Sequence, residues 1–263
     1  MQWRRQDNNW QWNVSPGVTA WFTTRLGGVS APPYDTRNLS FMVRDATSSV
    51  RENRRRSVPE VHRLVMAEQV HQEQLAWVGA ANAGQGAFEA STSVPGVDGL
   101  LTTDNDVVLG MGFADCVPIF LSDVVGSMVG ILHAGWRGTT LGIQIKAIEA
   151  LALKGWDLGR LRVGIGPSIG PCCYEVDDVV ARKVRDVLGH EETLAPGRDA
   201  NHFYLDLWTT NRLLLERAGI ERDNIDILGR CTACHPEEFF SHRRDKGRTG
   251  RMGGFICRTS NEI

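Results

Sequence analysis

The chain has 263 residues, of which 42% are hydrophobic and 23% charged, enough for a sizeable core in one large domain or two small ones. The 29 Lys and Arg residues against 31 Asp and Glu give a formal net charge of -2, so overall charge favours neither nucleic acid nor an anionic membrane surface. Because no run approaches the ~18–20 apolar residues of a membrane-spanning helix and the polar, Trp-rich N-terminus resembles no secretory signal, we expect a cytoplasmic protein.

Six short apolar or alternating runs, bounded by Gly, Pro, Asp or Ser, predict β-strands. They cover residues 18–24, 107–113, 117–121, 128–133, 162–165 and 225–228. Residues 81–97 are rich in Ala, Gly and Ser and predict a surface loop. We therefore expect a single domain that spans residues 1–263.

Helices are predicted at residues 139–154, 176–188 and 207–218. Apolar residues recur at helical spacing in the first, and each of the three stops at or beside a glycine. Asp206 is the expected N-cap of the third. Since helices and strands do not alternate strictly, a layered α/β or α+β domain with a mixed sheet is expected instead of a doubly wound Rossmann fold.

Three residues offer soft or borderline metal ligands: His71 in EQVHQEQ, Cys116 in FADCVPIFL and His133 in GILHAGWRG. Cys116 and His133 lie at the edges of two predicted strands with a tight connection. One thiolate and two imidazoles suit zinc and leave one position for water or substrate, as in catalytic sites. The same residues could instead form a metal-free cysteine nucleophile and histidine base.

Two further segments predict anion binding. The run HAGWRGTTLG places Arg137 at the start of a predicted helix, where backbone N–H groups favour an anion. The run FFSHRRDKGRTGRMGG gathers five cations among glycines, and part of it is expected to face a pocket as a phosphate clamp. Arg25, in TTRLGGVS, is a further guanidinium beside a glycine-rich turn.

The remaining cysteines match no established pattern well. Cys231-Thr-Ala-Cys234-His235 has the spacing of a c-type haem attachment site, which normally requires export. The same pair could be a redox dithiol, but it lies in no thioredoxin-like context. In a chain of this length, without an export signal, six cysteines are expected to be reduced thiols, core residues or metal ligands.

An ordered set of motifs extends from about residue 17 to residue 256. The motifs are TTRLGGVS, QVH, VDGLLT, ADCVPIFL, HAGWRGT, GPSIGPCCYEV, LDLWTTN and FFSHRRDKGRTGR. In these motifs the chain resembles the YfiH/YlmD family of laccase-domain proteins, also described as polyphenol oxidases and peptidoglycan-editing factors. The resemblance implies an α+β fold, an α/β/β/α four-layer sandwich with mixed sheets.

The resemblance also implies a zinc site on His71, Cys116 and His133. The implied activities are phosphorolysis of adenosine, inosine and methylthioadenosine, and deamination of adenosine. Two positions depart from the usual family pattern, because Gln72 and Ser40 stand where glycine is usual.

Site residues other than the metal ligands are expected within the same motifs. The predicted phosphate ligands are Arg25, Arg137 and Arg244, because guanidinium forks match phosphate oxygens. Asn38 and Cys173 are expected to bind substrate. The predicted catalytic residues, besides Cys116, are the carboxylates Asp98, Asp115 and Glu175. A strand at Asp115 would turn it away from Cys116, so it could instead orient a metal-binding histidine or cap a turn.

Competing functions would use different chemistry. Imidazole and thiolate also bind copper, so a polyphenol oxidase is the second hypothesis. However, the chain has only seven histidines and no H-x-H pair for several copper centres. A third hypothesis is a peptidoglycan-precursor editing factor, and a fourth is a cysteine hydrolase. The expected partners are small molecules, a purine nucleoside and phosphate, and neither nucleic acid nor a membrane is expected.

Overall fold

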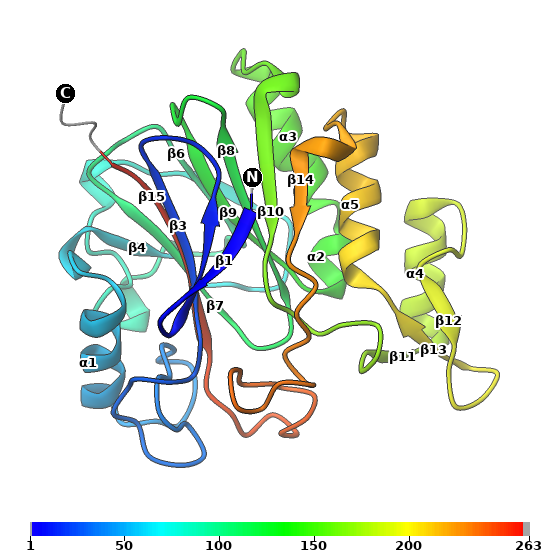
Figure 1. The fold of residues 1–263 in the computed structure, drawn as a ribbon, viewed down its shortest axis with the longest axis horizontal. Coiled ribbons are helices and arrows are strands. Elements are labelled where there is room, and N and C mark those ends of the chain that lie inside the picture. Colours follow the sequence, from blue (N-terminus) through cyan, green and yellow to red (C-terminus); the bar gives the residue numbers. More distant parts are fainter. Residues whose placement is uncertain (1, 260–263) are drawn as a thin grey trace.

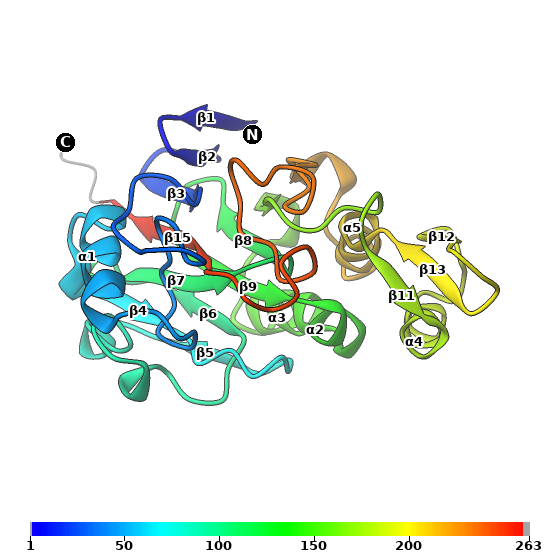
Figure 2. The same cartoon turned by 90° about the horizontal axis from the view of Figure 1, so that it is seen from below.

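Two six-stranded sheets lie face to face in the computed structural model, which describes residues 2–259 (Figures 1 and 2). The first sheet has the spatial order β1 (Gln2–Gln6), β2 (Asn9–Asn13), β3 (Val18–Thr23), β15 (Met252–Arg258), β7 (Val108–Phe113) and β4 (Leu64–Met66). The second has the order β14 (Ile225–Ile227), β10 (Leu161–Ile165), β8 (Val117–Asp123), β9 (Val129–Ala134), β6 (Gly99–Thr102) and β5 (Leu75–Trp77). Both sheets combine parallel and antiparallel pairs.

Side chains that alternate along the strands build two cores, one on each face of the second sheet. On β9, Ile131 faces the first sheet and packs with Phe113, while Leu132 faces the opposite side. On β8, Phe120 joins the inter-sheet core and Leu121 the outer one. Because these strands are buried on both faces, they appear in the sequence as short, nearly continuous apolar runs.

Helices complete the layers. The outer face of the second sheet packs against α2 (Trp136–Leu141), α3 (Ile143–Leu153) and α5 (Leu207–Arg217). On the outer face of the first sheet lies α1 (Thr47–Ser57). At one side, α4 (Asp178–Leu188) packs on a small sheet of β11 (Glu175–Asp177), β13 (His202–Leu205) and β12 (Leu194–Pro196). The predicted α/β/β/α sandwich with mixed sheets is confirmed.

The predicted helix over residues 139–154 is wrong in its extent. It begins earlier, at Trp136, and is divided at Gly142, whose φ of +81° is left-handed and ends α2 before α3 begins. Glycine adopts this conformation without the steric cost that a Cβ would add. Among the described residues, no helix is long and apolar enough to cross a membrane.

The helix α1 was not predicted, because it carries a single aliphatic residue, Val50, among four arginines. One of these, Arg54, is buried and donates hydrogen bonds to the carbonyls of Leu39, Gly86 and Ala87. The helix is therefore held by a polar contact to distant loops, which hydrophobic periodicity does not reveal.

Candidate active site

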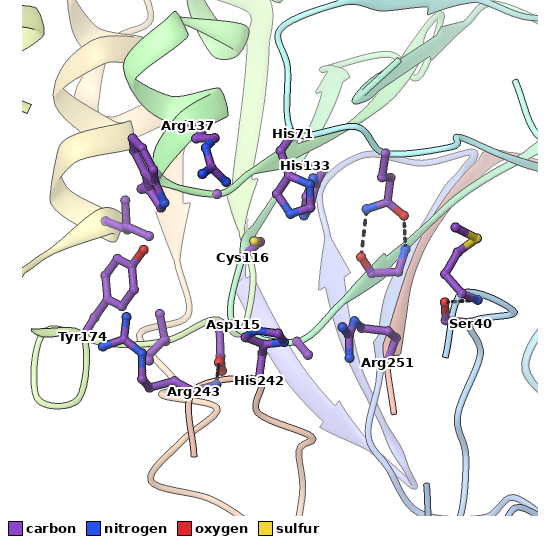
Figure 3. A pocket seen from close by; sticks show the side chains of 18 of the residues that line it. Ser40, His71, Asp115, Cys116, His133, Arg137, Tyr174, His242, Arg243 and Arg251 are labelled. Atoms are coloured by element: carbon purple, nitrogen blue, oxygen red, sulfur yellow. Dashed lines mark hydrogen bonds between the residues drawn. The ribbon is translucent and has the colours of Figure 1, made fainter. Parts of the chain in front are cut away.

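An open cavity of about 480 Å³ lies at one end of the sandwich, where loops from both sheets meet (Figure 3). The predicted ligands His71, Cys116 and His133 line it, and their ligand atoms all lie within 4.8 Å of one another. His133 is near the end of β9, Cys116 follows the end of β7, and His71 lies in the loop between β4 and β5. The structure therefore brings together three residues that are far apart in the sequence.

The buried carboxylate of Asp98 organises two of these ligands. It accepts hydrogen bonds from the backbone N–H groups of Val70, His71 and Gln72, at 3.0, 3.0 and 2.8 Å. His133 Nδ1 lies 2.8 Å from Asp98 Oδ1. Burial raises the pKa of Asp98, but these hydrogen bonds outweigh it and lower the pKa below its usual range. With Nδ1–H donated to Asp98, the Nε2 lone pair of His133 is the one available to a metal.

The neighbours of Cys116 favour its thiolate form. Burial raises the pKa of its thiol, but the two histidines outweigh burial and lower the pKa to about 6. Gly135 leaves room for the sulfur, because a Cβ at that position would lie 2.8 Å from Cys116 Sγ. The thiolate and two imidazoles, backed by Asp98, fit the donor set of a zinc site with an open position.

Three guanidinium groups line the same cavity. Arg137, in the first turn of α2, lies over the ring of Trp136, 4.7 Å from its centroid. Arg243 donates a hydrogen bond of 2.5 Å to the carbonyl of Glu175. Arg251 donates to the carbonyls of Thr249 and Gly250 at 3.1 and 2.9 Å. Within residues 2–259 none of the three forms an ion pair with a carboxylate. Their charge is therefore available to an anion in the cavity.

The other two predicted phosphate ligands do not line the cavity. Arg25 donates to Asp35 and to the carbonyl of Pro236, and it lies 4.6 Å from the centroid of the Phe240 ring. Arg244 pairs with Asp245 and donates to the carbonyls of Thr232 and Phe239. Both guanidinium groups hold the loops that surround the site.

The predicted catalytic carboxylate Asp115 lines the cavity, but its oxygens are occupied. They accept from Thr232 Oγ1 at 2.6 Å, Ser241 Oγ at 3.0 Å and Arg243 N at 2.7 Å. Asp115 lies in the loop between β7 and β8, where its φ is +88°, and not in a strand. The alternation of side chains along a strand therefore does not turn it away from Cys116, as the sequence had suggested.

The remaining predicted residues lie outside the cavity wall. Glu175 accepts from Arg198 N at 2.9 Å. Asn38 is fully buried, and its Oδ1 accepts from the backbone of Ser40 and Arg251, which do line the cavity. Cys173 lies in a separate group of cysteines.

Several lining residues were not predicted individually. The Gln69 side chain forms hydrogen bonds of 2.8 Å with both the N–H and the carbonyl of Gly112, which fixes the loop that precedes His71. Tyr174 and His242 also line the cavity. They lie within the motifs GPSIGPCCYEV and FFSHRRDKGRTGR, and their position in these motifs could have indicated that they belong to the site. Burial raises the pKa of Tyr174.

Comparisons with known proteins cover nearly the whole chain. Residues 19–259 match the family described as multi-copper polyphenol oxidoreductase laccase. A relative from Geobacillus stearothermophilus, purine nucleoside phosphorylase YlmD, is 42% identical over 254 residues, which cover 92% of this chain and 90% of the relative. The crystal structure of YlmD from that species has a TM-score of 0.94 at 38% identity, over 98% of this chain and 99% of that one. The crystal structure of the Bacillus licheniformis hypothetical protein YfiH has a TM-score of 0.93 at 37% identity, over the same shares.

Proposed function

The chain belongs to this laccase-like family, which confirms the predicted resemblance, and we propose that it is a zinc-dependent purine nucleoside phosphorylase. Adenosine, inosine and methylthioadenosine are the proposed substrates. One observation carries the proposal: a single cavity holds both the His71, Cys116 and His133 cluster and three arginines that form no ion pair with a carboxylate among residues 2–259.

Phosphorolysis requires an anion site next to a site for the sugar and base. A phosphate oxygen bonds to the anomeric carbon of ribose while the bond from that carbon to the purine nitrogen breaks. The purine then leaves with the electron pair and takes up a proton. Arg137, Arg243 and Arg251 would bind the phosphate and hold it for attack. Arg25 and Arg244 would contribute indirectly by fixing the loops.

The other side chains of the cavity suit the purine and its proton. Trp136, Tyr174 and Leu207 offer apolar and aromatic surface to the base. His242 also lines the cavity, and its imidazole is the proposed proton donor to the leaving purine. Asp115 would position Arg243 through its backbone N–H.

The metal would be held by His71, Cys116 and His133, with Asp98 orienting His133. Bound zinc would supply a Lewis acid that polarises a substrate or water oxygen. Adenosine deamination is proposed as a second reaction of the same cavity, in which water adds to C6 of the purine ring and the amino group leaves as ammonia, so that inosine forms. In the described part of the chain, only one possible metal cluster combines imidazole with thiolate, so the several copper centres of a laccase are not favoured.

Product analysis by mass spectrometry tests the proposal. Metal-assayed protein is incubated with inosine or adenosine, with and without phosphate. Ribose 1-phosphate and free base should form only with phosphate, and inosine should form from adenosine without it. Cys116→Ala should strongly reduce the yield of both products, whereas Cys257→Ala, which removes a thiol in β15, should reduce neither. Absence of both products from protein with about one zinc per chain in this cluster would overturn the proposal.

A further inference from the structure

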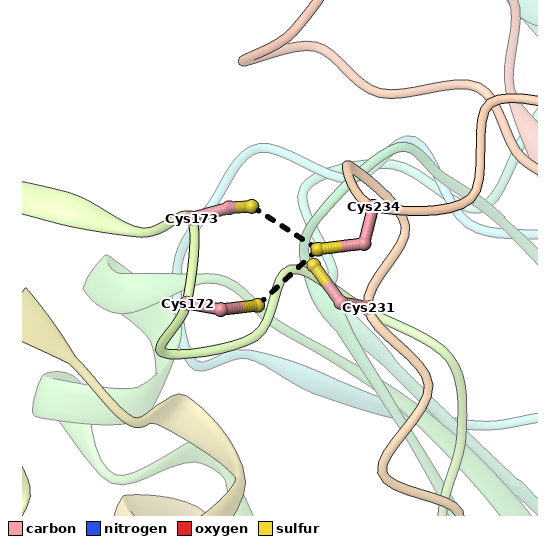
Figure 4. Close-up of side chains that lie close together, drawn as sticks. All are labelled: Cys172, Cys173, Cys231 and Cys234. Atoms are coloured by element: carbon pink, nitrogen blue, oxygen red, sulfur yellow. Dashed lines mark hydrogen bonds between the residues drawn. The ribbon is translucent and has the colours of Figure 1, made fainter.

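Four cysteines outside the cavity converge on one point (Figure 4). Cys172 and Cys173 lie in the turn between β10 and β11, and Cys231 and Cys234 lie in the turn after β14. Their sulfur atoms are all within 4.8 Å of one another. Cys234 Sγ is 3.4 Å from the sulfur atoms of both Cys172 and Cys173.

The backbone brings these two turns together. Ser168 and Cys231 form an isolated parallel bridge, which aligns the two segments just before the cysteines. Cys173 N and Tyr174 N both donate to the carbonyl of Gly170 and so close the first turn. A Cβ at Gly170 would lie 3.2 Å from Cys231 Cβ, so the absence of a side chain permits this close approach.

A backbone N–H group points at one of the sulfurs, because Gly170 N lies 3.2 Å from Cys231 Sγ. Burial raises the pKa of Cys231, but hydrogen bonds from backbone and neighbouring thiols outweigh it and lower the pKa. Burial and neighbouring sulfurs instead raise the pKa of Cys172, and they raise that of Cys173 to about 12. A bound cation would offset the negative charge of four clustered thiolates.

We propose that Cys172, Cys173, Cys231 and Cys234 form a second metal site, which holds a zinc ion in a closed tetrathiolate. Zinc–sulfur bonds of about 2.3 Å in a tetrahedron separate the sulfurs by about 3.8 Å, within the range of the cluster. On binding, each protonated thiol releases its proton as its sulfur bonds to zinc. Disulfides would require only pairs of close sulfurs, whereas a tetrahedral ion requires that all four be close together.

This site would fix part of the cavity without contacting a substrate. Tyr174, which directly follows the cysteine pair, lines the cavity. Thr232, between the other two cysteines, donates to Asp115 at 2.6 Å. Four protein ligands leave no coordination position open, so the role is structural. The inference does not depend on the reaction proposed for the cavity.

The test uses full-length Cys116→Ala protein, which lacks the thiolate of the cavity cluster and is purified under reducing conditions. Titration of the metal-free protein with Zn²⁺ against a chromophoric chelator should show about one tight site per chain. X-ray absorption at the zinc edge should show four sulfur neighbours at about 2.3 Å. Both measurements are made with all four cysteines of the proposed site intact.

A second variant locates the ion. Adding Cys234→Ser to Cys116→Ala should remove the tight zinc, whereas adding Cys257→Ala, a matched loss of a thiol elsewhere, should not. The proposal is overturned if reduced protein binds no zinc, if the absorption spectrum shows nitrogen or oxygen ligands, or if alkylation and mass spectrometry of freshly isolated protein show these cysteines paired as disulfides.

Discussion

The two cysteine-containing clusters differ in their scaffold and in their surroundings. Cys116 and His133 are fixed at the ends of buried strands, lie beside the buried carboxylate of Asp98 and face a cavity. The four-cysteine cluster comes from two surface turns, and Cys172 and Cys234 are exposed. Mixed donors beside a cavity suit exchange of substrate, whereas four sulfurs suit permanent binding. From this difference we expect the cavity cluster to take part in the reaction and the four-cysteine cluster to stabilise the fold.

The largest expected effect is on turnover, and it should distinguish the clusters. Cys116→Ala should lower kcat/KM for inosine phosphorolysis by about 10³-fold, close to 4 kcal/mol of barrier, because the metal loses its only thiolate ligand. Cys172→Ser should retain turnover but unfold at a lower temperature. Steady-state kinetics and thermal unfolding of both variants provide the comparison. Equal losses of turnover would show that the clusters are not separate in function.

Asp98→Asn should weaken zinc binding at the cavity by about 10- to 100-fold, because His133 and the loop at His71 lose a charged acceptor. Zinc affinity is measured by competition titration with a chelator in protein that also carries Cys172→Ser, so that only the His71, Cys116 and His133 cluster is titrated. Asp123→Asn is the matched control: Asp123 is also buried and accepts from Ser127 N at 2.6 Å, but it lies away from the metal ligands. The Asp123→Asn variant should bind zinc at the cavity as tightly as the Cys172→Ser protein does.

Arg137→Ala should raise the KM for phosphate by about 10- to 100-fold, since one charge-assisted contact contributes about 1.5–3 kcal/mol. Arg25→Ala should instead lower stability and leave this KM nearly unchanged, because its guanidinium is bound to Asp35 and Pro236. Phosphate titrations at saturating inosine and chemical denaturation separate the two effects. An equal rise of the phosphate KM in both variants would contradict the assignment of Arg137, and not Arg25, to phosphate binding.

The smallest effect concerns the loop that carries Cys231 and Cys234. Glu238 in this loop accepts hydrogen bonds from Arg230, Trp10 and Arg5. Burial raises the pKa of Glu238, but these partners outweigh it and lower the pKa. The ionised carboxylate therefore stabilises the fold above its unfolded pKa of about 4.3, and this contribution is lost as pH falls through the lower folded value.

Glu238→Gln should accordingly reduce the free energy of unfolding by about 1 kcal/mol at pH 7 and have less effect in acid. Urea denaturation at several pH values measures the difference. Glu237→Gln, at the exposed neighbouring position, should show little change at either pH. A difference that grows toward acid pH would contradict the sign of this argument.

The sequence predicted four strands of the second sheet, β8, β9, β10 and β14, but not β5 and β6. It also predicted the grouping of His71, Cys116 and His133, whereas it predicted the cavity wall less well. Strands such as β8 and β9 are buried on both faces, so their local composition reveals them. The proposed metal ligands came from the ligand chemistry of one thiol and two imidazoles and from motifs of the family. Local sequence could not distinguish Arg25 from Arg137, since both lie beside glycines. Only contacts across the fold, such as that of Arg25 with Pro236, decide which guanidinium faces the cavity.

The four-cysteine cluster was missed for a related reason. Cys231 and Cys234 have a recognisable spacing, but the pair that completes the group lies about sixty residues earlier, at 172–173. Adjacent cysteines match none of the usual zinc-finger spacings. The bridge between Ser168 and Cys231 that unites the pairs is a tertiary contact, which no local pattern encodes.

Asp98 holds the loop at residues 70–72 through three main-chain N–H groups. Main-chain donors are present whatever the side chain, so the loop keeps its shape when Val70 or Gln72 is replaced by any residue but proline. This explains how glutamine is accommodated at position 72 beside a metal ligand. It also makes positions 70 and 72, both exposed, tolerant of substitution in randomised libraries, while the backbone at His71 between them remains in place.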